Sequence, residues 1–106
     1  MEIVTNYQKM LIKCLKEEIR AFLTYSDNEK EANLREMAKD WLFNDEYNLG
    51  GEFSCIRICK NLGKNIETLR MNVLFAKGKQ WTLEDYMDYT LYGEAPKRRK
   101  ADDKNK

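Results

Sequence analysis

Apolar residues recur at steps of three and four along most of this chain, and no other feature limits its fold as strongly. In the first 25 residues the pattern runs through Leu11, Leu15, Ile19 and Phe22, while charged residues occupy the opposite side. This spacing predicts a long amphipathic helix over residues 5–25. Similar patterns follow, so we expect an all-α fold, a small bundle of four or five helices.

Helix-starting and helix-ending residues separate these apolar segments. Ser26 and Glu29 have capping-box spacing ahead of an apolar pattern over residues 34–42, which predicts a second helix. Residues 44–51 contain adjacent glycines and indicate a loop.

Thr82 and Asp85 have capping-box spacing ahead of a last helix that we expect to end near Gly93. We therefore expect a single helical domain over residues 1–94. Residues 95–106 are basic and carry almost no apolar side chains, so they are expected to form a disordered tail.

Two short helices joined at a glycine form the one motif that points to a function. Ser54 can cap the first helix, Gly63 stands where that helix ends, and Asn65 can cap the second. This arrangement over residues 54–76 is typical of a helix-turn-helix. Such a motif needs a small residue between its helices and an apolar anchor in each of them. The residues that meet these needs are Cys59, Ile58, Leu62 and Leu69. Two adjacent helices of a plain bundle remain the alternative interpretation.

The charge distribution supports a nucleic-acid partner for this motif. The whole chain has 19 basic and 18 acidic residues and a net charge of +1. Residues 53–79 carry six basic residues against Glu67 alone, a net +5, and residues 95–106 carry +4. Residues 1–52 and 80–94 each carry −4. Positive charge is thus concentrated on the helix-turn-helix and the tail.

These positions predict three sets of DNA contacts. Residues on the second helix that project away from its apolar face are expected to meet base edges: Glu67, Thr68, Arg70, Met71 and Asn72. Basic residues around the motif are expected to contact phosphates: Arg57, Lys60, Lys64, Lys77 and Lys79. The tail would add contacts through Lys97, Arg98, Arg99 and Lys100. For the tail, a role limited to solubility stays open.

The run from Trp41 to Glu46, the run from Phe53 to Gly63 and the pair Leu69-Arg70 resemble a pattern in small uncharacterised phage and bacterial proteins. In that pattern a tryptophan and an acidic pair precede Phe-Ser-Phe, an Ile/Val-Cys pair, Leu-Gly and a Leu-Arg or similar pair. The resemblance covers roughly residues 36–75 and implies a helix-turn-helix of the kind found in phage or mobile-element regulators. The chain departs from it at Cys55, where phenylalanine is usual, and at residues 64–66, where the turn often holds aspartate and proline.

The sequence therefore predicts a protein that binds double-stranded DNA and regulates transcription in a phage or mobile element. The alternative is a small interaction module that binds a host protein, such as the transcription machinery or a defence complex. A homodimer is expected through the first helix or through Tyr86, Tyr89 and Tyr92, which recur at every third position.

Composition disfavours other classes. The chain has no histidine, the commonest general base and metal ligand, so we expect neither an enzyme nor a cofactor. Cys14, Cys55 and Cys59 are too few for a closed zinc site and are expected to be reduced thiols. No apolar run approaches the ~20 residues of a membrane span. No secretory signal is visible, so a cytoplasmic location is expected.

Overall fold

The computed structural model describes residues 5–26, 28–46, 51 and 53–96. In this part of the chain every regular element is a helix, and there are five of them. They are α1 (Asn6–Thr24), α2 (Glu29–Phe43), α3 (Cys55–Leu62), α4 (Ile66–Ala76) and α5 (Leu83–Tyr92). The expected all-α bundle is confirmed. No helix in the described part of the chain combines the length and the apolar character that crossing a membrane would require.

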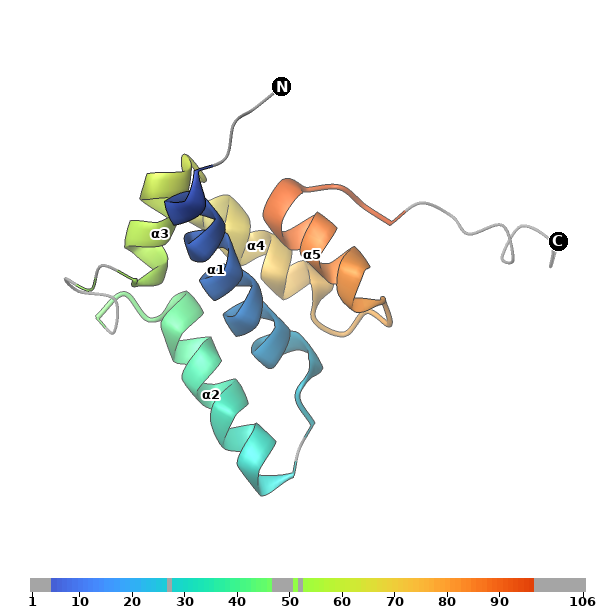
Figure 1. Cartoon of the computed structure of the whole chain (residues 1–106). Coiled ribbons are helices and arrows are strands. Elements are labelled where there is room, and N and C mark those ends of the chain that lie inside the picture. The colour runs from blue at the N-terminus through green and yellow to red at the C-terminus, as the bar shows by residue number, and fades with distance from the viewer. Residues whose placement is uncertain (1–4, 27, 47–50, 52, 97–106) are drawn as a thin grey trace, which may run out of the picture.

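Helix α1 is the centre of the bundle. It contacts each of the other four helices, and Figure 1 shows it between α2 on one side and α4 and α5 on the other. Leu11, Leu15 and Ile19 are fully buried on its inner side, as their spacing predicts. Thr5 caps the helix with a capping box that includes Gln8.

Helix α2 begins two residues later than a cap at Ser26 would place it. Asn28, not Ser26, is the N-cap, and its side chain accepts a hydrogen bond from the Glu31 backbone N–H. The Glu31 carboxylate in turn accepts the Ser26 N–H at 2.8 Å, and this hydrogen bond lowers the pKa of Glu31. The expected capping box of Ser26 and Glu29 is therefore wrong, because the equally good cap Asn28 starts the helix and the Ser26 N–H is bound by Glu31 instead.

Helices α3 and α4 form the expected helix-turn-helix arrangement. Ser54 caps α3 by accepting the Arg57 N–H, and Asn65 caps α4 by accepting the Thr68 N–H. Between them Gly63 adopts a left-handed conformation with φ of 70°. The Gly63 N–H donates to the Lys60 carbonyl, and the Lys64 N–H donates to the Cys59 carbonyl. These two hydrogen bonds form a Schellman motif at the C-terminal end of α3. Ile58, Cys59 and Leu69 are buried as predicted, and Leu62 packs against the core at its edge.

Helix α5 closes the bundle against α1 and α4. Thr82 caps it by accepting the Asp85 N–H, and it ends in left-handed Gly93, both as predicted. Tyr86 is buried and donates its hydroxyl to the Lys79 carbonyl. Of the other tyrosines on α5, Tyr89 packs at the edge of the core and Tyr92 is exposed. This triplet is thus divided between interior and surface.

Candidate nucleic-acid interface

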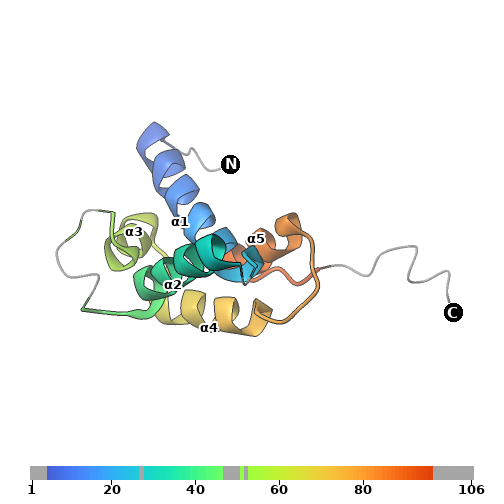
Figure 2. The ribbon, with the colours of Figure 1, turned by 90° about the horizontal axis from the view of Figure 1, so that it is seen from below.

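The outward face of α4 is open to solvent. Leu69, Val73 and Ala76 hold the helix to the core, and the opposite side of its first two turns exposes Glu67, Thr68 and Met71. Figure 2 shows α4 along the lower edge of the molecule, with no helix below it. The structure therefore leaves three of the five residues expected to meet base edges accessible on one surface.

Arg70 and Asn72, the other two, are engaged within the fold. The guanidinium of Arg70 donates from Nε to the Leu42 carbonyl at 2.8 Å and from Nη2 to the Asp45 carboxylate at 2.7 Å. Its side chain is only 13% exposed. Asn72 donates its amide to the Tyr89 carbonyl at 3.3 Å. These two side chains connect α4 to the end of α2 and to α5.

Two of the cations expected to contact phosphates lie on the surface of α3. Arg57 and Lys60 are both exposed and stand three residues apart, which places them on adjacent turns of one helix face. Lys60 is also in the last turn of α3, where a cation complements the helix dipole.

Lys77 and Lys79 are exposed just beyond the C-terminal end of α4. The ammonium of Lys77 lies 4.8 Å from the ring centre of Phe22, and that of Lys79 lies 4.4 Å from the ring centre of Phe75. Exposed cations therefore occur on the helix before α4 and in the turn after it.

Lys64 has an internal role. It donates to the Leu91 carbonyl at 2.7 Å and lies 4.6 Å from the ring centre of Tyr92, so it ties the α3–α4 turn to the end of α5. Together with Thr68 and Asn72 it lines an open hollow of about 370 Å³. The structure thus brings three predicted DNA-contact residues together around this hollow. Two of them, Lys64 and Asn72, already donate hydrogen bonds to backbone carbonyls of α5.

The basic tail, Lys97, Arg98, Arg99 and Lys100, lies outside the described residues, as does much of the expected loop over residues 44–51.

The cysteines of α3 are packing residues. Cys55 and Cys59 are 0% and 1% exposed. A hydrogen bond with Cys59, reinforced by burial, raises the pKa of the Cys55 thiol, which keeps it protonated. Among the described residues no cluster of three or more Cys, Asp or Glu side chains is arranged to hold a metal ion.

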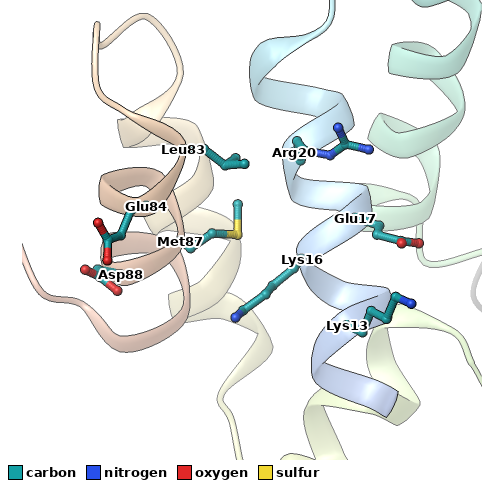
Figure 3. Close-up of a pocket in the computed structure, with 8 residues that line it drawn as sticks. All are labelled: Lys13, Lys16, Glu17, Arg20, Leu83, Glu84, Met87 and Asp88. Carbon is teal, nitrogen blue, oxygen red and sulfur yellow. The ribbon is translucent and has the colours of Figure 1, made fainter. Parts of the chain in front are cut away.

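An open groove of about 490 Å³ lies between α1 and α5. Figure 3 shows Leu83 and Met87 pointing from α5 toward α1, and Lys16 extending toward α5. Glu84 and Asp88 point away from α1 in the same view. The charged groups do not converge on a common point, so the groove lacks the set of oriented polar groups that defines a ligand site.

Sequence reasoning missed Leu74 and Phe75, which are 56% and 52% exposed on the outer side of α4 beside Met71. Helical spacing alone contains this signal, because both positions lie away from the side of Leu69 and Val73. They make the C-terminal half of the exposed face apolar.

No protein-family model, no curated protein and no solved structure matches this chain.

Proposed function

We propose that this protein binds double-stranded DNA through its helix-turn-helix and regulates transcription in a phage or mobile element, as its sequence resemblance to small phage and bacterial proteins implies. One observation carries the proposal: α4 follows α3 through a left-handed glycine turn and presents the outer side of its first two turns to solvent. A major groove about 12 Å wide admits one such helix.

The side chains on that surface have suitable chemistry for base edges. Thr68 and Met71 can contact thymine methyl groups, and Glu67 can accept a hydrogen bond from cytosine N4. Arg57 and Lys60 before α4, and Lys77 and Lys79 after it, would contact phosphates on either side of the groove. Arg70, Asn72 and Lys64 would act indirectly, by holding α4 in place.

Phosphate contacts make affinity depend on salt, and this dependence provides the test. Duplexes selected by the protein from a random library should bind in fluorescence anisotropy, and log Kd should rise linearly with log salt concentration. Lys60→Gln and Arg57→Gln should each reduce the slope by about one, the value for one lost phosphate contact. Lys39→Gln, at an exposed position of α2, should leave the slope unchanged.

Base reading is tested separately with Thr68→Ala. This variant should lose discrimination at one base pair, by less than the ~1–3 kcal/mol of a bidentate pair because the contact is a single methyl group, and keep the wild-type salt slope. Failure to bind any duplex at low salt would refute the proposal, and so would an effect of Lys39→Gln equal to that of Lys60→Gln.

The interaction-module alternative has one observation in its favour, the exposed apolar side chains of Met71, Leu74 and Phe75. Large exposed apolar patches on soluble proteins mark contact surfaces for other macromolecules. If no duplex is retained, a host-protein complex that resists nuclease treatment becomes the better explanation of α4.

A further inference from the structure

The exposed residues of α4 form one stripe along the helix, here called the outer stripe. Its members stand three, four and seven residues apart and so share one side of the helix; they are Glu67, Thr68, Met71, Leu74 and Phe75. No helix lies below α4 in Figure 2. The first turn of the stripe is polar, whereas Met71, Leu74 and Phe75 are apolar and 68%, 56% and 52% exposed. The face that we propose for DNA therefore continues into an apolar end.

The aromatic ring at this apolar end is supported by two others. The Phe75 ring centre lies 5.3 Å from that of Tyr89 and 6.5 Å from that of Trp81. Trp81 and Tyr89 are partly buried, and their own ring centres are 5.4 Å apart. Because its ring already packs on these two, Phe75 loses little conformational freedom when another surface covers it. A connected apolar group of this kind indicates a surface that another macromolecule covers.

The charge around the apolar end favours a nucleic acid as that macromolecule. Residues 71–79 include two lysines and no acidic residue. Lys77 and Lys79 are both exposed, and the Lys79 ammonium lies 4.4 Å from the Phe75 ring centre. Phosphates border the major groove, so a helix that lies in the groove brings cations at its end close to phosphates while its outer side faces the bases. The apolar end and the lysines beside it suit the same ligand as the polar end.

Thymine is the base whose major-groove edge best matches an apolar side chain. It presents a C5 methyl group there, whereas guanine, adenine and cytosine present mainly hydrogen-bond donors and acceptors. An apolar side chain packed against such a polar edge would leave donors or acceptors without a partner, which costs free energy. Leu74 and Phe75 should therefore select thymine at the positions that they cover.

We propose that Leu74 and Phe75 determine sequence specificity by packing against thymine methyl groups in the major groove. This inference rests on the proposed DNA binding and adds the kind of sequence that the apolar end of α4 recognises. Phe75 follows Thr68 by seven residues, or about 10 Å along the helix axis. Successive base pairs are about 3.4 Å apart. The selected thymines thus lie about three base pairs from the base pair that Thr68 contacts.

Deoxyuridine tests this assignment, because it pairs as thymine does and lacks only the C5 methyl group. Thymines of a duplex selected by the protein are replaced one at a time, and Kd is measured by fluorescence anisotropy at a fixed salt concentration. Thr68→Ala identifies the base pair that Thr68 contacts. About three base pairs from it, replacement of thymine should weaken wild-type binding about fourfold, the value of one buried methyl group.

Leu74→Ala and Phe75→Ala should each lose this fourfold difference at the thymine that the side chain covers. Both should keep the wild-type salt slope, because neither removes a phosphate contact. Both positions are exposed, so far-UV circular dichroism should show wild-type helix content. Leu74→Ala also leaves the three packed rings intact, so its effect cannot come from their rearrangement. Met37→Ala, at a methionine of α2 that is 58% exposed, is the control and should keep every thymine preference.

Two results would overturn the inference and leave the proposed function in place. One is a wild-type protein that binds equally well with deoxyuridine at every position of the selected duplex. The other is a methyl preference that both alanine variants retain at these positions, which would leave the apolar end of α4 to a protein partner. Failure to bind any duplex at low salt would instead overturn the proposed function and this inference with it.

Discussion

At the scale of single residues, Arg70 shows how a surface position on a helix becomes part of the interior. Its place on α4 lies outside the apolar face, yet the end of α2 supplies the Leu42 carbonyl and the turn that follows α2 supplies the Asp45 carboxylate. An arginine fork can bond a carbonyl and a carboxylate together, which lysine cannot do with the same geometry. Arg70 thereby links α2 to the helix that we propose for DNA.

This role predicts a loss of stability from Arg70→Met, which keeps the apolar stem and removes the charge. The free energy of unfolding, measured by urea denaturation, should fall by about 1.5–3 kcal/mol, because hydrogen bonds with a charged partner are lost. Asp45→Asn should cost less than about 1 kcal/mol, since the Asp45 side chain is 70% exposed and its ion pair is screened by water. An Arg70→Met protein as stable as the wild type would show that these contacts do not persist in solution.

At the scale of elements, helix ends depend on residues within a few positions of one another. Ser54, Gly63, Asn65, Thr82 and Gly93 occupy their predicted capping positions because each bonds backbone groups of its own helix terminus. Ser26 does not occupy its predicted capping position. Asn28 stands two residues later, and only one of the two can be the N-cap of α2.

The turn between α3 and α4 yields a prediction at this scale. Gly63→Ala should lower the free energy of unfolding by about 1–2 kcal/mol, the cost of a left-handed conformation for a residue with a Cβ atom. No heavy atom lies within 4 Å of that Cβ, so the cost is conformational and not steric. Gly51→Ala is the matched control: Gly51 is not left-handed, and its Cβ would make ordinary contacts of 3.7 Å and 3.8 Å with Ser54. Equal stability of the two variants in urea would contradict this account.

At the scale of the whole molecule, α1 unites the fold because it contacts all four other helices. Leu15 lies near its middle and is completely buried. Leu15→Ala should reduce the free energy of unfolding by about 2–5 kcal/mol, a large part of the ~5–15 kcal/mol typical of a domain. Ile12→Ala, at a half-buried position one turn earlier, should cost less.

The Leu15→Ala variant also tests whether the bundle unfolds as one unit. Trp41 belongs to α2 and Trp81 precedes α5, so tryptophan fluorescence reports on two distant parts of the chain. Fluorescence and far-UV circular dichroism should give the same transition in the wild type and in Leu15→Ala. Separate transitions would show that α1 does not couple the helices.

The sequence by itself determined the all-α class with four or five helices, most of the helix ends and the glycine turn between α3 and α4. These features depend on apolar spacing and on hydrogen bonds between residues three to five positions apart. Only the tertiary structure decided which polar side chains of the helix-turn-helix face inward. Arg70, Lys64 and Asn72 find their partners 28, 27 and 17 residues away, respectively. No local pattern encodes such pairings, because they exist only once the helices have packed against one another.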